Sequence, residues 1–259
     1  GGHVMFSHYT YFDELVDKML GGDFDEHMRE AWVWMHERFV PYPFQNNIKF
    51  LPKEVVLECL LGLIEAQKQP IDKNQFANFE ELIRGVFGVG IVKHFMMPYN
   101  FKVWAHPPKM LNKEWIGQRV SVVDIKKVLG NVILDRDDAG WGPNATFKYP
   151  RFGGTGGLFE RMRPFVNDNL RTNADVVGID TEKKEVVTSD GTRESYDELL
   201  STMPIDILVS RMNGAVPDSI KDEAKRLRHS GSLIVGVGIR QPAPSTRCWM
   251  YFPEDNCPF

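Results

Sequence analysis

The order of hydrophobic and polar residues predicts a helix followed by a β-hairpin at the start of the chain. Residues 11–20 carry apolar side chains at helical spacing, so we expect a helix that Thr10 caps and Gly21-Gly22 ends. Residues 28–41 alternate instead, which predicts a hairpin that turns near His36-Glu37. The prolines of Pro41-Tyr42-Pro43 then favour an extended exit, because proline disfavours helix at the residue before it.

The pattern of residues 50–130 is helical. Pro52 stands where a first-turn proline belongs, and apolar residues repeat at helical spacing over 55–64. A second helix is predicted to begin near Asn78. Further helical segments are expected over residues 88–97, 98–104 and 112–129. Together these segments predict a helical bundle.

Short runs of β-forming residues replace the helical pattern after residue 130. We expect strands at 131–134, 145–149, 174–180, 185–189, 193–201, 231–240 and 247–252. Helices are expected between them, at 157–168, 204–213 and 217–229. Asp190-Gly191 favours a hairpin turn between two of the strands. The chain as a whole therefore has an α+β pattern.

The composition is that of a globular protein. Of the 259 residues, 42% are hydrophobic and 25% are charged, and the net charge is -4. Such a chain can bury a sizeable core, and without a basic run it does not fit nucleic-acid binding. Three unevenly placed cysteines form neither a disulfide framework nor a zinc motif, which favours a reduced, cytoplasmic setting. No apolar run reaches the roughly 18 residues of a membrane span, so we expect no membrane association.

Both ends of the chain are unusual. It opens on Gly1-Gly2-His3 without an initiator Met and stops at Cys257-Pro258-Phe259, directly after an aromatic run. We therefore expect an internal fragment of a longer protein. The absence of a signal peptide then says nothing about targeting.

Two glycine-rich segments could approach a ligand closely. Residues 153–157 (GGTGG) lead into a predicted helix whose N-terminus favours anions, although many such turns bind nothing. The run is not a dinucleotide fingerprint, because no hydrophobic strand precedes it and no acid follows at the expected distance. Gly1-Gly2-His3 could wrap around a planar cofactor or form an ordinary loop. No metal-ligand spacing and no nucleophile elbow are present.

Several aromatic and amide side chains suit a small ligand. Residues 42–47 (YPFQNN) could recognise sugar hydroxyls or a uracil edge, or could form a well-packed loop. Phe95 and Tyr99 share a helix face, as do Asn100 and Trp104, although Pro98 must kink or restart the helix. Such a stripe is core by default, but a buried Asn100 needs hydrogen-bond partners, which favours a pocket.

One arginine and two strand residues complete the candidates. Arg119 stands among apolar neighbours, where a guanidinium pairs with an acid or binds a phosphate. Trp249 and Tyr251 are two apart and so lie on one face of a strand, which is either core or the wall of an aromatic pocket.

Taken in order, six sequence blocks carry a family resemblance. They are Gly1–Val4 (GGHV), Val40–Ile48 (VPYPFQNNI), Pro98–Trp104 (PYNFKVW), Trp141–Phe147 (WGPNATF), Gly153–Gly157 (GGTGG) and Cys248–Phe259 (CWMYFPEDNCPF). Together they resemble the UDP-galactopyranose mutases, particularly the eukaryotic branch, across essentially the whole chain.

The resemblance implies an α/β flavoprotein. Its Rossmann-like FAD-binding fold would lack the N-terminal βαβ unit in this chain, which is α+β, and would carry an inserted helical bundle and an antiparallel sheet. Residues 1–47 would be a remnant of the FAD-binding domain with its hairpin, and 48–130 the helical bundle. Residues 131–259 would hold the mixed substrate-domain sheet and the returning FAD-domain segments.

The resemblance also implies an activity. In that family, N5 of reduced FAD attacks the anomeric carbon of UDP-galactose and displaces UDP, and the covalent flavin–galactose adduct allows the sugar ring to reclose in the other size. UDP-galactopyranose and UDP-galactofuranose are thereby interconverted, for galactofuranose biosynthesis. The implied partners are FAD, with NADPH or NADH as its reductant, and UDP-galactose. Oligomeric state varies within the family, so the resemblance is compatible with a homo-oligomer.

Roles follow from the matching motifs. Gly2, His3 and Val4 would lie against the flavin ring, and Val176 would contact the adenine end of FAD through its backbone. Arg119 and Tyr251 would hold the diphosphate and, with Gly2 and His3, make up the catalytic set. The remaining substrate contacts implied are Tyr42, Phe44, Gln45, Phe95, Tyr99 and Asn100 for uridine, and Trp104, Asn144 and Trp249 for the sugar and pyrophosphate.

Two alternatives remain beside the mutase. The strand–GxGxxG–helix unit of the family and an arginine expected just beyond Phe259 lie outside this chain, so the activity would belong to the parent protein. Another amine-oxidase-like FAD oxidoreductase would share the generic fold, including a strand around Glu198–Met203. A non-catalytic UDP-sugar-binding protein would not need a Gly2-His3 loop shaped for flavin.

Overall fold

The structure is a computed structural model that describes residues 3–5, 7–68, 70–116, 123–138, 145–214 and 216–258. The chain forms two units. The first comprises Gly1–Leu158 and Ser232–Phe259, and the second comprises Phe159–Gly231. The three-part division predicted from the sequence, with boundaries after residues 47 and 130, stays a prediction.

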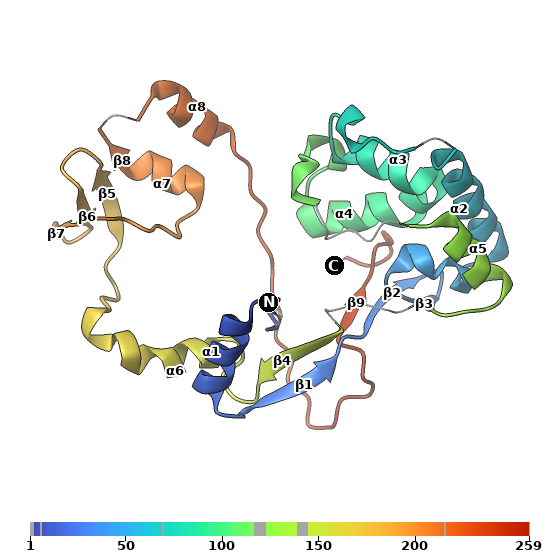
Figure 1. Ribbon diagram of the computed structural model, residues 1–259, viewed down its shortest axis with the longest axis horizontal. Coiled ribbons are helices and arrows are strands. Elements are labelled where there is room, and N and C mark those ends of the chain that lie inside the picture. Colours follow the sequence, from blue (N-terminus) through green and yellow to red (C-terminus); the bar gives the residue numbers. More distant parts are fainter. Residues whose placement is uncertain are drawn as a thin grey trace. The chain divides into compact units, whose positions relative to one another are not determined.

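The described residues form a mixed α/β chain with several small sheets (Figure 1). The helices are α1 (Thr10–Leu20), α2 (Lys53–Ala66), α3 (Phe79–Ile91), α4 (Met97–Trp104), α5 (Ile125–Ile133), α6 (Gly156–Val166), α7 (Ile205–Arg211) and α8 (Asp218–Arg226). Shorter helical segments are η1 (Phe44–Asn46), η2 (Ile48–Phe50), η3 (Lys73–Gln75), the π-helical η4 (Val92–Met96), η5 (Pro108–Met110), η6 (Glu114–Ile116) and η8 (Asn167–Asn169).

Nine named strands are grouped into three sheets within the described part of the chain. They are β1 (Phe24–Met28), β2 (Ala31–Met35), β3 (Arg38–Pro41), β4 (Thr146–Pro150), β5 (Val176–Asp180), β6 (Glu185–Thr188), β7 (Arg193–Ser195), β8 (Met212–Asn213) and β9 (Trp249–Tyr251). The strand orders are β1-β4, β3-β2-β9 and β7-β6-β5-β8.

The first two predicted elements are present. Helix α1 ends at Gly21, which adopts a left-handed conformation with φ of 58°, as expected for a glycine after a helix. Thr10 does not cap this helix: it is the first helical residue, and the N-cap is Tyr9. The predicted hairpin is confirmed as β2 and β3, and its turn residues His36 and Glu37 both have positive φ.

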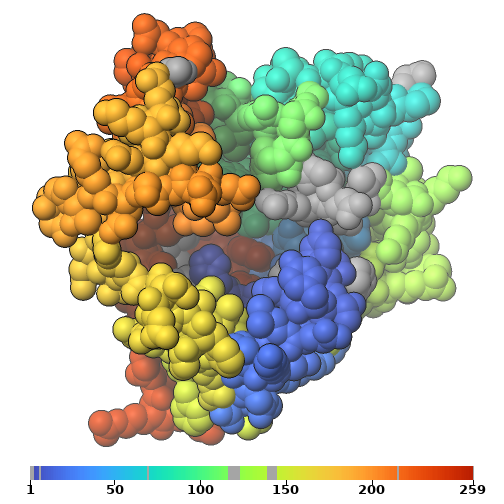
Figure 2. Space-filling view, turned by 60° about the vertical axis from the view of Figure 1, so that its left-hand side comes forward, coloured from blue at the N-terminus to red at the C-terminus, as the bar shows by residue number. Residues whose placement is uncertain are grey.

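The helical region contains the main core of the first unit. Val33, Phe44, Leu63, Ile83 and Phe95 are among its fully or almost fully buried side chains. Helices α3 and α4, coloured cyan to green, gather on one side in the space-filling view (Figure 2). The predicted helix start near Asn78 is confirmed. Asn78 caps α3, because its side chain accepts a hydrogen bond from the backbone N–H of Glu81.

Two predictions in this region are wrong. Residues 112–129 do not form one helix: η6 is a short turn, and α5 begins only at Ile125, after Asp124 caps it. Residues 131–133, predicted to begin a strand, are the last turn of α5. They belong to the helix because Val128 and Asn131 share its buried face, and Asn131 donates to the backbone oxygen of Asn46 at 3.1 Å.

The second unit is built on an antiparallel meander with a parallel edge. Strands β5, β6 and β7 pair in sequence, and β8 pairs with β5 in parallel. The turn predicted at Asp190-Gly191 is confirmed: the Asp190 carboxylate accepts from the Thr188 hydroxyl at 2.6 Å and from the Thr192 backbone at 2.9 Å. These bonds hold the pKa of Asp190 down at about 2.

Two predicted strands are shorter or missing. The strand predicted over 193–201 is confirmed only for β7, and 231–240 forms no strand. Apolar side chains of the second segment are exposed, with Leu233 at 95% and Val237 at 79%. A β-forming sequence becomes a strand only when another strand offers its backbone, and no such partner reaches this segment among the described residues.

Candidate functional site

Strand β9 carries two candidate residues into the centre of the first unit. It pairs in parallel with β2, so that Trp249 lies opposite Ala31 and Tyr251 lies opposite Val33. Trp249 and Tyr251 are half-buried, whereas Met250 between them is 47% exposed. The predicted common face of Trp249 and Tyr251 is therefore confirmed.

An irregular helical segment, from α3 through η4 to α4, brings Phe95 and Tyr99 close to Tyr251 of β9. Gly88 interrupts α3 with φ of 71°, η4 widens the next turn into a π-helix, and Pro98 stands in the first turn of α4. Pro98 does not restart the helix, because Ile91, Met96 and Met97 keep helical φ and ψ and the run continues from η4 into α4. The rings of Phe95 and Tyr99 stack, with centroids 4.8 Å apart and an angle of 18° between their planes.

Five aromatic rings form one cluster at this point. Phe44 stacks on Phe95 at 4.4 Å, and Tyr42 lies 6.4 Å from Phe95. Tyr251 contacts Tyr42 at 5.6 Å and Tyr99 at 5.2 Å, the latter edge-on. We call these five residues (Tyr42, Phe44, Phe95, Tyr99 and Tyr251) the ring cluster.

Burial keeps the phenols of the ring cluster protonated. It raises the pKa of Tyr42 to about 12, with the neighbouring Tyr251 adding to the increase. Burial also raises the pKa of Tyr99 and of Tyr251. Their hydrogen bond raises the pKa of Tyr99 and lowers that of Tyr251, as expected if Tyr99 donates. The three hydroxyls are therefore neutral groups that can donate at any physiological pH.

Arg29 is a neighbour that sequence reasoning missed. Its positive charge partly offsets the rise that burial causes in the pKa of Tyr42, Tyr99 and Tyr251. Its guanidinium carbon lies 5.3 Å from the centre of the Trp249 ring. The only local signal was a basic residue directly before an apolar strand, and the same kind of signal had singled out Arg119. Because β1 and β2 meet near Arg29, its place beside β9 depends on a contact far along the chain.

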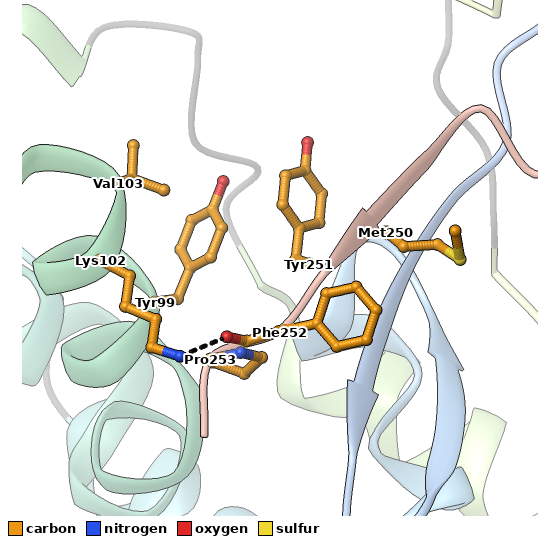
Figure 3. Close-up of a pocket in the computed structure, with 7 residues that line it drawn as sticks. All are labelled: Tyr99, Lys102, Val103, Met250, Tyr251, Phe252 and Pro253. Atoms are coloured by element: carbon orange, nitrogen blue, oxygen red, sulfur yellow. Dashed lines mark hydrogen bonds between the residues drawn. The ribbon is translucent and has the colours of Figure 1, made fainter. Parts of the chain in front are cut away.

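A cavity of about 190 Å³ opens beside Tyr99 and Tyr251 (Figure 3). In the close-up the two phenol hydroxyls point in the same direction, away from the ammonium group of Lys102. The cavity is lined by Tyr99, Lys102, Val103, Met250, Tyr251, Phe252 and Pro253.

Other predicted substrate residues lie around the ring cluster in different environments. Gln45 is buried, and Asn100 is 5% exposed with its amide donating to the Met96 backbone oxygen at 2.7 Å. Trp104 lies in a second aromatic group, because its ring contacts Trp115 at 5.0 Å and is 37% exposed. Trp249 packs edge-on against Phe147 at 5.1 Å.

The amide of Asn47 bonds to the backbone of its own loop and of residue 138. Asn47 is fully buried, and its side-chain nitrogen donates to the backbone oxygens of Pro43 at 3.0 Å and Asp138 at 2.7 Å. Its side-chain oxygen accepts from the Asp138 backbone N–H at 3.0 Å. For Asn47 the packed-loop alternative therefore describes the structure.

Replacing this amide is expected to be costly. We expect Asn47→Ala to lower the free energy of unfolding by about 2 kcal/mol, because backbone groups of Pro43 and Asp138 lose a buried partner. Chemical denaturation of the two proteins measures the difference. Asn74→Ala, at a position exposed in η3, is the control, and equal losses in both variants would contradict the assignment.

The residues predicted to contact FAD are described in part. His3 is exposed, and its backbone oxygen accepts a hydrogen bond from the Thr155 hydroxyl at the start of α6. Val4 leads into Met5, which bridges to Lys148. Val176 begins β5 in the second unit, and its backbone oxygen accepts from Arg211. Gly2, Arg119 and Asn144 lie outside the described residues.

Within the described ranges, no three His, Cys, Asp or Glu side chains gather as metal ligands do. Cys59 is a buried free thiol whose pKa is raised to about 12, chiefly by burial and further by Glu58. Such a thiol is protonated and inert as a nucleophile. The neutral phenols of the ring cluster instead lie near the positive charge of Arg29, and such donors suit an anionic organic ligand.

The described residues thus form a mixed α/β protein in which two rings of the ring cluster, those of Tyr99 and Tyr251, line a cavity. Over its whole length the chain is 38% identical to a protein whose structure is described as that of reduced UDP-galactopyranose mutase, with a TM-score of 0.89. The resemblance to UDP-galactopyranose mutases that the sequence motifs indicate is therefore confirmed. The chain spans 57% of the length of that protein.

A second solved structure shows the fold alone. It is a protein from Pyrococcus furiosus that is 15% identical, with a TM-score of 0.50, and the match covers 83% of this chain and 49% of that one. No family model matches the chain. In the described residues, every helix is too short or too polar to cross a bilayer.

Proposed function

We propose that the protein, in its full natural length, is a UDP-galactopyranose mutase that interconverts UDP-galactopyranose and UDP-galactofuranose. The observation that supports this most strongly is the 38% identity to a UDP-galactopyranose mutase along every part of the chain. It is reinforced by the ring cluster, because four of its five members (all but Phe95) come from three of the blocks that carry the resemblance, Val40–Ile48, Pro98–Trp104 and Cys248–Phe259.

The ring cluster supplies the binding chemistry in this proposal. Tyr42 and Tyr99 offer ring surface to the uracil, with Phe44, Gln45, Phe95 and Asn100 supporting them. The Tyr251 hydroxyl, held neutral by burial, donates to a diphosphate oxygen. Arg119 gives the charge that stabilises UDP as it leaves, and Arg29 adds a second positive charge near the same phenols. Trp104, Asn144 and Trp249 border the sugar.

FAD is the cofactor in this proposal, and two observations support its fit near His3. The Thr155 hydroxyl holds the backbone of His3 while leaving the side chain exposed. At the adjacent helix start, a side chain at Gly156 would meet no atom within 4 Å, so the space there is open. Gly2, His3 and Val4 would contact the ring, and the backbone of Val176 the adenine end.

When bound and reduced, FAD would supply the nucleophile that takes the place of UDP on the sugar, with NADPH or NADH as the source of electrons. The residues of this chain would bind the nucleotide, neutralise its charge and hold the sugar in place. The Rossmann-like FAD-binding domain that this requires is part of the proposal.

A mutase assay tests the proposal directly. The full-length protein is loaded with FAD, reduced with dithionite and mixed with UDP-galactofuranose, and we expect UDP-galactopyranose to form. Oxidised enzyme is the control and should be inactive. If the reduced, FAD-loaded protein forms no product, the mutase assignment fails. Net oxidation of a substrate would favour an amine-oxidase-like oxidoreductase instead.

Arg119 offers a sharper test of the diphosphate site. We expect Arg119→Ala to weaken UDP binding at least thirtyfold, because losing a charge-assisted contact of this kind costs on the order of 2–5 kcal/mol. The flavin absorption spectrum should not change. Titration calorimetry measures the affinity, with Arg84→Ala as the control, since Arg84 pairs with Glu80 on an exposed face of α3. Equal UDP affinities for Arg119→Ala and the wild type would contradict the proposed contact between Arg119 and the diphosphate.

A further inference from the structure

The side chain of Lys102 donates hydrogen bonds to three backbone carbonyl oxygens. Its ammonium group donates to the oxygens of Phe252 at 2.8 Å, Glu254 at 2.7 Å and Cys257 at 2.6 Å. The first of these bonds closes one end of the cavity in Figure 3. A lysine ammonium has three N–H donors, so its donors match the three carbonyls that converge on it. The segment 252–257 is therefore folded around the end of this side chain.

The same segment is tied to a second element. The Glu254 carboxylate accepts from the backbone N–H of His36, in the β2–β3 turn, at 3.2 Å. A bond from the Cys257 N–H to the Glu254 oxygen, at 3.2 Å, closes the segment on itself. Residues 252–257 thus connect α4 to the hairpin, and these two elements flank the ring cluster.

This connection fixes a functional pair of side chains. Tyr251 directly precedes the segment, and Tyr99 lies on α4 one turn before Lys102. Strand β9 is paired to β2 only as far as Tyr251, so the residues beyond it are held by other bonds. Because Lys102 joins them to the helix that carries Tyr99, it sets the distance between the two rings, which is 5.2 Å.

We propose that Lys102 is a positioning residue, which holds Tyr251 against Tyr99 so that their hydroxyls meet the diphosphate of a nucleotide in one arrangement. That the two hydroxyls bind a diphosphate rests on the proposed function. That Lys102 holds Tyr251 against Tyr99 does not, because it concerns only contacts within the chain. Lys102 touches no ligand in this proposal and acts through Tyr251.

Two properties favour a lysine here. Its compact ammonium can direct donors to carbonyls that converge from several sides, whereas the donors of a guanidinium all lie in one plane. Its four-carbon stem also lines the cavity together with Val103 and Pro253. Lys102→Met keeps most of the stem and removes the three donors, so it isolates their contribution.

The first experiment is a double-mutant cycle on UDP affinity in the full-length, FAD-loaded protein. We expect Lys102→Met to raise the UDP dissociation constant at least tenfold, and Lys109→Met, an exposed lysine of η5, to change it less than twofold. In a Tyr251→Phe background, Lys102→Met should raise it less than threefold further, because coupled residues are not additive. An unchanged constant, or a full tenfold loss in both backgrounds, overturns the positioning role.

The second experiment needs no ligand. Hydrogen exchange of a peptide covering residues 249–258 should be at least tenfold faster in Lys102→Met than in Lys109→Met, while a peptide from α1 exchanges equally in both. Equal exchange of 249–258 overturns the proposal, and so does faster exchange with unchanged UDP affinity. If wild-type protein does not bind UDP, the proposed function fails and the exchange rates alone decide on Lys102. Lys102→Gln replaces Lys102→Met if the latter does not fold.

Discussion

Gly90→Ala is expected to lower the free energy of unfolding by about 3 kcal/mol, because the new methyl group would meet backbone on every near side. Its carbon would lie 2.4 Å from the Glu58 backbone oxygen and 2.6 Å from the Cys59 Cα, both in α2. Both atoms belong to the backbone and not to a flexible side chain. The steric clash can therefore be removed only if α2 and α3 move apart. Chemical denaturation of the 259-residue chain measures the loss.

Gly130→Ala is the matched control. Gly130 also lies in a helix, α5, but a methyl group there would meet nothing within 4 Å. Because alanine favours helix over glycine, this variant should gain about 0.5–1 kcal/mol. A Gly90→Ala variant as stable as Gly130→Ala would show that the two helices do not touch through Gly90.

The same helix crossing matters for the site. Helix α3 runs into η4, which carries Phe95, and the Phe95 ring is held between Phe44 and Tyr99. A displaced α3 would therefore carry the middle ring of the ring cluster with it. Under the proposed function, folding and nucleotide binding would therefore be coupled through the close approach of two backbones.

Most of the turns and helix ends predicted from residues close together in the sequence are confirmed, although the predicted Thr10 cap is not. Three local predictions, the β2–β3 turn at His36-Glu37, the start of α3 near Asn78 and the Asp190-Gly191 turn, depend on bonds within a few residues, and the structure confirms each. The end of α5 was predicted as a strand because Val132 and Ile133 are β-branched and Leu134 is apolar. Their helical membership depends on Asn131 reaching the Asn46 backbone, 85 residues earlier.

Distant pairings could not be read from the sequence. Strand β1 lies against β4, and β2 lies in parallel against β9, which are separated by more than a hundred residues. The segment 231–240 shows the converse, since its composition favours a strand but its side chains are exposed. Strand formation depends on a partner, and periodicity alone does not reveal one.

For the candidate site, the family resemblance supplied what periodicity could not. Pattern alone predicted that Phe95 and Tyr99 share a face, and that Trp249 and Tyr251 do. That these two faces meet at Tyr99 and Tyr251 follows from the β2–β9 pairing. Arg29 and Lys102 escaped attention because a single basic residue beside apolar neighbours carries little information until the fold shows what surrounds it.

Alkaline pH should destabilise the chain through the ring cluster. The pKa of Tyr42 is about 12 in the folded state, against about 10 for a tyrosine in the unfolded chain. Between these values the folded state keeps the proton and the unfolded state loses it, so stability falls as pH rises. Two pKa units correspond to about 3 kcal/mol, lost between pH 10 and pH 12 and fully present below pH 10.

Tyr42→Phe removes this contribution, because phenylalanine has no proton to lose. We expect its free energy of unfolding to fall less steeply than that of the wild type above pH 10, with the two curves parallel below it. Urea denaturation at a series of pH values measures both curves, and Tyr11→Phe, at a 71% exposed position, should follow the wild type. Parallel curves for Tyr42→Phe and wild type up to pH 12 would mean that Tyr42 is solvated in the folded protein. Such a result would contradict the burial of Tyr42 within the ring cluster.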